Sequence, residues 1–68
     1  MNEEALNMSL RKFLKVVGVT SQQEIEKAIR TALADGRLTG NETLKARMVL
    51  TIEGIGLTHN VEGQIELR

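Results

Sequence analysis

The segment from Leu44 to Ile52 alternates between apolar and polar residues. Its even-numbered residues are all apolar, and its odd-numbered residues are polar except for Val49. A period of two places these two sets on opposite faces of a pleated strand. The pattern therefore predicts a strand that packs on one face and is mostly solvated on the other.

The alternation resumes from Leu57 to Leu67, where the odd-numbered positions carry the apolar residues. Opposing residues of an antiparallel pair share a face, so their numbers must here sum to an odd value. Pairing Ile52 with Leu57 meets this condition and leaves Gly54-Ile55 as a two-residue type II′ turn. The same register pairs Leu50 with His59, Met48 with Val61, Ala46 with Gly63, Thr51 with Thr58, and Arg47 with Glu62.

Two details of this predicted hairpin stay open. A two-residue turn at Glu62-Gly63 would break the alternation, so we expect one long strand that bends at Gly63. A three-residue turn would keep the alternation and would start a second hairpin. Leu38 could add a short third strand before the turn signal Gly40-Asn41.

An apolar stripe with helical spacing opens the chain. It predicts a first helix from about Asn2 to Val17, capped by Asn2 and ended by Gly18 in the left-handed C′ position. The stripe consists of Leu6, Leu10, Phe13, Leu14 and Val17.

A second stripe predicts a second helix that ends at Gly36, directly after Asp35. Ser21 and Glu24 form a capping box before it, with Thr20 and Gln23 as a competing register. Glu26 and Arg30 form an i,i+4 pair in the favourable orientation. The stripe consists of Ile25, Ala28, Ile29, Ala32 and Leu33.

These elements predict an α+β fold of order ααββ, in which two antiparallel helices precede a long antiparallel β-hairpin. We expect a single domain over residues 1–68, with the helices covering the aliphatic face of the hairpin. A chain of this length is near the lower limit for a core of its own. Such chains often gain stability from a second copy.

The composition excludes several chemistries. The chain lacks cysteine, so it forms no disulfide and no thiolate metal site. Its nine basic and nine acidic residues balance, which argues against long-range attraction to nucleic acid or to an anionic membrane. The acidic start Met1-Asn2-Glu3-Glu4 is unlike a signal peptide, and no apolar run is long enough to span a bilayer. We expect a cytoplasmic protein.

No residue pattern points to catalysis, a cofactor or a metal. His59 is the only histidine, and we interpret it as a half-buried structural residue because it occupies an apolar position of a strand. One histidine with scattered carboxylates makes no metal site. Gly54-Ile55-Gly56 lacks the helix that a phosphate-binding glycine loop requires. We therefore expect a protein that is not an enzyme.

The segment Gly18-Val19-Thr20-Ser21 between two predicted helices resembles the turn of a helix-turn-helix. Two departures from that family weaken the resemblance: Glu24 and Lys27 occupy its buried positions, and Glu24 and Glu26 begin the would-be recognition helix. The segment AIRTALADGRLTG is similar to the entry of gluconate-repressor-type winged-helix proteins. Nucleic-acid binding is therefore the alternative function, and its basic candidates are Arg11, Lys12, Lys15, Arg30 and Arg37.

From MNEEALNMSLRKFLKVVGVTSQQEIEKA to the terminal VEGQIEL, the chain resembles a small uncharacterised bacterial protein family of about this length. The resemblance implies a complete, free-standing protein and supplies no functional residues. We predict a non-enzymatic protein-interaction module whose partner is another protein or a second copy. The predicted interaction surface is Val49 with Arg47 and Thr51. A two-fold homodimer would either pair strand edges into a four-stranded sheet or stack the sheets around Val49.

Overall fold

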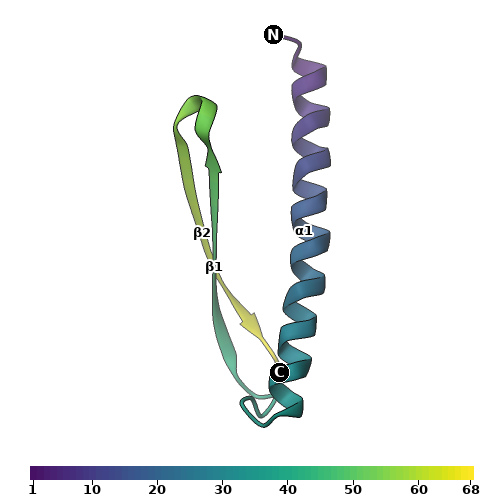
Figure 1. Cartoon of the computed structure of the whole chain (residues 1–68), viewed down its shortest axis with the longest axis vertical. Coiled ribbons are helices and arrows are strands. Elements are labelled where there is room, and N and C mark those ends of the chain that lie inside the picture. The colour runs from purple at the N-terminus through teal and green to yellow at the C-terminus, as the bar shows by residue number, and fades with distance from the viewer. The chain divides into compact units, whose positions relative to one another are not determined.

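One helix followed by one β-hairpin makes up the chain, in a computed structural model that describes residues 1–68 (Figure 1). The helix α1 spans Glu3–Ala34, and the strands β1 and β2 span Thr43–Ile52 and Leu57–Glu66. A short 3-10 helix, η1, spans Glu53–Ile55 between the strands. The chain divides into two units, Met1–Arg37 with the helix and Leu38–Arg68 with the hairpin. The α+β class is confirmed, but the prediction of two helices is wrong.

The two apolar stripes belong to a single helix because they join into one line with a repeat of eleven residues. Such a repeat fits about 3.67 residues per turn, which keeps its members on one side of a long helix. Ser21 fills the one polar place in this line. The repeat consists of Leu6, Val17 and Ala28, then Leu10, Ser21 and Ala32, then Leu14 and Ile25.

The residues that predicted a break lie inside α1 and satisfy their polar groups there. Gly18 has no positive φ, so it is not the left-handed residue that ends a helix. Thr20 donates its hydroxyl to the Val16 carbonyl at 2.7 Å, one turn back, instead of capping a new helix. A glycine inside a helix costs only up to about 1 kcal/mol, so these local signals do not outweigh the continuous helix.

Both outer ends of the helical region were predicted. The Asn2 side chain accepts a hydrogen bond from the Ala5 amide at 3.1 Å and so caps the first turn. At the other end Gly36 has φ +83°, and the Arg37 amide donates to the Ala32 carbonyl at 2.9 Å. With the Gly36 amide donating to the Leu33 carbonyl, this is a Schellman motif, which needs the left-handed glycine.

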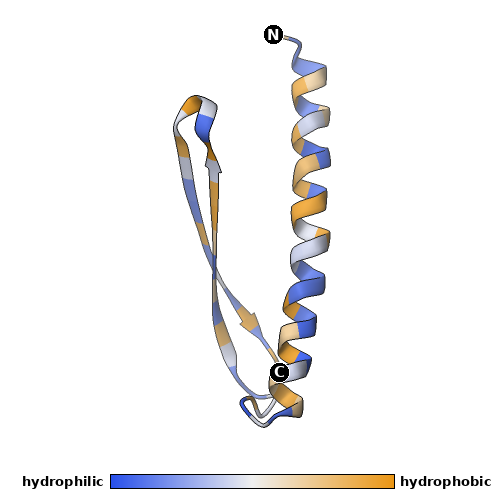
Figure 2. Ribbon diagram, in the orientation of Figure 1, coloured by the Kyte–Doolittle hydropathy of each residue, from blue (hydrophilic) through white to orange (hydrophobic).

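The hairpin has the predicted register along its whole length. Ile52 opposes Leu57, Val49 opposes Asn60, and the pairing continues without a bulge to Thr43 and Glu66. β2 runs through Gly63 as one strand, so the second hairpin does not form. Apolar and polar residues alternate along both strands (Figure 2). The register therefore gives the hairpin an aliphatic face and a polar face that includes Val49.

The turn between the strands differs from the prediction. η1 replaces the two-residue type II′ turn, and pairing stops at Ile52 and Leu57. The left-handed residue is Gly56, with φ +62°, rather than Gly54. The Gly56 amide donates to the Glu53 carbonyl at 3.2 Å and closes the loop. The parity of the strands fixed their register, but the same register also accommodates this four-residue connection.

No third strand forms before β1. The residues around Leu38 make a turn in which Gly40 has φ +101°. The Glu42 carboxylate accepts hydrogen bonds from the Thr39 amide at 2.8 Å and the Gly40 amide at 2.9 Å. Beyond the turn the Leu67 amide donates to the Glu42 carbonyl at 3.0 Å, which extends the ladder between the strands by one residue.

Candidate interaction surface

The predicted interaction residues lie together in the middle of β1. Arg47, Val49 and Thr51 are alternate residues and share the polar face, where they oppose Glu62, Asn60 and Thr58 of β2. Val49 is 51% exposed, although it is the one apolar residue on this face of the strand. The register thus builds a small apolar spot between a guanidinium and a hydroxyl.

An open depression of about 270 Å³ lies beside this spot. Lys45, Ala46, Arg47 and Glu62 line it. Pockets that enclose small molecules are usually larger, roughly 300–1,000 Å³, and mostly apolar. The depression is therefore smaller and more charged than a typical small-molecule pocket.

The hydrogen bond between Leu67 and Glu42 shows which residues of β1 direct their backbone groups toward β2. These two residues are directly opposed and bonded, so hydrogen-bonded pairs of the hairpin have an even-numbered residue in β1. The backbone groups of the odd-numbered residues then point away from β2. The free edge of β1 consists of the N–H and C=O groups of Lys45, Arg47, Val49 and Thr51.

Neither a proline nor a bulge protects this edge. The chain has no proline, and the pairing of β1 shows no bulge. Both devices are common ways to protect an edge strand from pairing with another chain. The polar face and the free edge therefore present the same three residues, Arg47, Val49 and Thr51, through their side chains and their backbone respectively.

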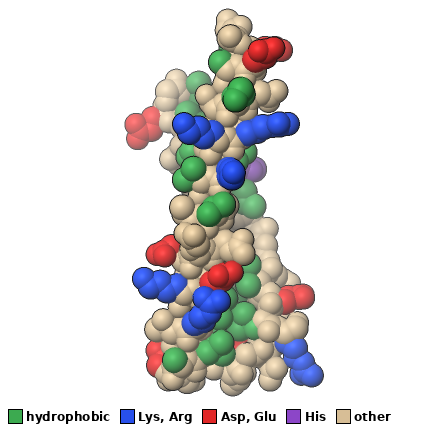
Figure 3. All heavy atoms as spheres, turned by 90° about the vertical axis from the view of Figure 1, so that its right-hand side faces the viewer, with side chains coloured by type: hydrophobic (Ala, Val, Ile, Leu, Met, Phe, Trp, Pro, Cys, Tyr) green, Lys and Arg blue, Asp and Glu red, His purple; other side chains and the backbone are tan.

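The nucleic-acid candidates of α1 fall into two groups. Arg11, Lys12 and Lys15 lie within about a third of the helix circumference, at roughly 100° per residue. They make no ion pair, whereas Arg30 lies 3.8 Å from the Glu26 carboxylate. Figure 3 shows basic side chains in the upper part of the view and again in its lower part.

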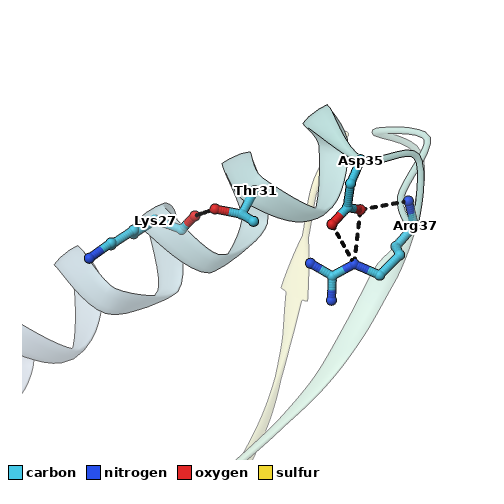
Figure 4. Close-up of polar contacts among 4 residues, drawn as sticks. All are labelled: Lys27, Thr31, Asp35 and Arg37. Carbon is cyan, nitrogen blue, oxygen red and sulfur yellow. Dashed lines mark hydrogen bonds and ion pairs between the residues drawn. The ribbon is translucent and has the colours of Figure 1, made fainter.

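Arg37 is the most constrained of the basic candidates. Its Nε donates to both carboxylate oxygens of Asp35 at 2.9 Å, and its amide donates to one of them at 3.2 Å (Figure 4). The same figure shows the Thr31 hydroxyl, which donates to the Lys27 carbonyl at 3.0 Å inside the helix. The turn that resembled a helix-turn-helix is part of α1, so no recognition helix exists as a separate element.

Two carboxylates have pKa values lowered by hydrogen bonds. The Arg37 guanidinium lowers the pKa of Asp35, and the Thr39 and Gly40 amides lower the pKa of Glu42. Asp35 is exposed and Glu42 is half-buried, and both hold turns together. They are not placed beside a nucleophile, so these pKa shifts indicate structure rather than catalysis.

His59 opposes Leu50 as predicted, but its side chain is exposed rather than half-buried. No group of three or more acidic or histidine side chains could hold a metal ion. The sequence reasoning also missed the backbone contribution of Lys45 to the free edge. Alternation reveals which face a side chain occupies, but it does not reveal which residues bond to the neighbouring strand.

Comparison with known proteins gives one match. A model for a family of unknown function (DUF6494) matches residues 1–68, the full extent of the chain. No curated protein and no solved structure matches it. The 32-residue helix α1 has no segment both long and apolar enough to cross a membrane.

Proposed function

The chain belongs to this family of unknown function, and we propose that it is a non-enzymatic protein-interaction module. Membership of the family assigns no activity, so the proposal is argued from the surfaces of the chain. Its partner is another protein or a second copy of the chain, bound through the polar face around Val49. The cytoplasmic location expected from the sequence belongs to the same proposal.

One observation carries the proposal: the chain leaves most of its large apolar side chains exposed. Ala32 is its only buried residue, while Phe13 is 50% and Val49 51% exposed. Burying apolar surface gives roughly 25 cal/mol per Å², so a partner that covers such residues is stabilised by doing so. Exposed apolar groups with free strand edges are typical of interaction surfaces.

Capture from a cell extract with matched variants tests the proposal. The baits are the wild type, Val49→Lys, and Thr58→Lys as a control on the same face of the neighbouring strand. We expect a protein that the wild type and the control retain and that Val49→Lys loses. Equal capture by all three baits would contradict a binding surface centred on Val49.

Nucleic-acid binding is the second candidate, and the three unpaired basic residues of α1 favour it. In this proposal Arg11, Lys12 and Lys15 contact phosphates along one side of a straight helix, without a helix-turn-helix. Three phosphate contacts give a slope of about −2 to −3 for log K against log salt. Fluorescence anisotropy with a labelled duplex measures this slope, and Lys12→Gln with Lys15→Gln should reduce it by about two.

A further inference from the structure

We propose that the partner of the β1 edge is a second copy of the same edge, paired antiparallel about a two-fold axis at Val49. This inference rests on the proposed function and names its partner. It joins two hairpins into one four-stranded sheet whose central strands are the two copies of β1. The observations behind it are the direction of the free backbone groups, the register of charges, and the exposure of Val49.

Backbone geometry allows this pairing without any shift of the strands. An axis at Val49 places Val49 opposite Val49, and Arg47 opposite Thr51 of the second copy. All of these residues are odd-numbered and have their N–H and C=O groups directed to the free edge. The hydrogen-bonded pairs that the dimer needs are therefore the pairs that the hairpin leaves unsatisfied.

Repulsion between the Arg47 side chains favours an axis at Val49 over an axis at Arg47 or Met48. An axis at Arg47 would oppose two guanidinium groups directly, and an axis at Met48 would separate them by about 7 Å along the strands, at about 3.4 Å per residue. An axis at Val49 separates them by about 14 Å. The Val49 axis therefore keeps the two guanidinium groups furthest apart among these three registers.

The outer edge of β2 is the weaker candidate for self-pairing. Its outward-directed residues include Asn60 and Glu62 but no apolar residue, and its interior contains Gly63, which lowers strand stability. Pairing through β1 instead places two copies of Val49 side by side. A β-branched pair directly across strands is a favourable contact.

Amide exchange on the unmodified protein tests the edge directly. At high protein concentration we expect slowed exchange at the Lys45, Arg47, Val49 and Thr51 amides, which the hairpin alone leaves free. The Thr58, Asn60, Glu62 and Gln64 amides of the β2 edge are the internal control and should exchange rapidly. Protection of the β2 edge alone would overturn the proposal. So would a protein that keeps the monomer mass of 7.5 kDa and shows no protection at either edge.

Cysteine substitution tests the axis, because the native chain has no cysteine that could interfere. Val49→Cys should form a disulfide with itself on mild oxidation, since residues on the axis have Cα atoms about 5.5 Å apart. Asn60→Cys, its neighbour across the hairpin, should form the same dimer but no disulfide. A disulfide that forms only when the two variants are mixed would indicate head-to-tail pairing of β1 with β2 and would refute the two-fold dimer.

Proline variants separate the edge from the hairpin itself. Val49→Pro removes an outward N–H and should raise the dissociation constant at least tenfold, with the β1–β2 amides still protected. Asn60→Pro makes the same change on the other edge and should leave the dimer intact. Loss of the dimer in both variants, or in neither, would contradict the assignment. If the wild type stays monomeric yet still captures a partner through Val49, this inference fails and the proposed function stands.

Discussion

Glu42 acts within its turn as an acceptor for two backbone amides that have no other partner there. Its carboxylate bonds the Thr39 and Gly40 amides, and these bonds favour the ionised form. The pKa is therefore lower in the folded chain than in the unfolded chain. The resulting stabilisation is present above the unfolded pKa and is lost as the pH falls through the folded one.

We predict that acidification opens this turn before it affects the strands. The chemical shifts of the Thr39 and Gly40 amides should follow the titration of Glu42, with a midpoint below its ordinary value of 4.5. Glu42→Gln keeps one acceptor oxygen but removes the charge, so those amides should no longer respond to pH. Nuclear magnetic resonance over this pH range checks both outcomes, and an amide response that persists in Glu42→Gln would exclude Glu42 as its source.

A second prediction at the residue scale concerns the glycines of the hairpin turn. Gly56 has φ +62°, so Gly56→Ala should destabilise the hairpin by about 1–2 kcal/mol. Gly54 has no positive φ, and a Cβ added there would meet nothing within 4 Å. Gly54→Ala should therefore have little effect. Thermal unfolding of both variants decides the matter, since a type II′ turn at Gly54-Ile55 would reverse their order.

At the scale of the elements, the hairpin was more predictable than the helix. Strand register depends on parity, and a shift of one residue would turn every aliphatic residue of β1 to the polar face. The helix break was predicted from Gly18, Thr20 and Ser21, which are boundary residues in many proteins. These residues are equally compatible with a helix interior when the apolar pattern continues past them. The repeat of eleven residues was the signal that favoured one helix.

Because α1 is uninterrupted, replacing its only glycine should change the stability of the chain in a predictable direction. Gly18→Ala should stabilise the chain by about 0.5–1 kcal/mol, because alanine has the higher helix propensity and its Cβ would meet no atom within 4 Å. Circular dichroism during thermal unfolding measures the change. If Gly18 instead ended a first helix in a left-handed conformation, the same substitution would destabilise the chain.

Part of the candidate surface could also be predicted at this scale. Val49 is visible as the apolar exception on a polar face, and Arg47 and Thr51 follow from its spacing. The free backbone groups of the edge could not be predicted, because alternation is the same whichever set of residues bonds to β2. One hydrogen bond, from the Leu67 amide to the Glu42 carbonyl, supplies that information.

Neither of the two units, taken by itself, has enough buried residues to form a core. Ala32 alone is buried, whereas Met8, Phe13 and Val49 are at least half exposed. A chain that completes its core with a second copy becomes more stable as its concentration rises. Association should therefore contribute measurably to the free energy of unfolding.

We predict that the melting temperature depends on protein concentration. A roughly hundredfold increase should raise it by several degrees, since each tenfold increase favours a dimer by about 1.4 kcal/mol. Val49→Pro should remove this dependence if the β1 edge is the contact. Melting curves that coincide at all concentrations would show instead that the chain unfolds as a monomer.

The register of the hairpin also has a kinetic consequence. Its pairs can close one after another outward from Ile52 and Leu57, and α1 bonds only residues within one turn of each other, so each new contact closes only a short loop. Such elements form within about 0.1–10 μs. Two proteins at micromolar concentration meet far more slowly, at about 10⁵–10⁷ M⁻¹s⁻¹. Refolding should therefore show a fast phase independent of concentration, followed by a second-order phase in which preformed hairpins find each other.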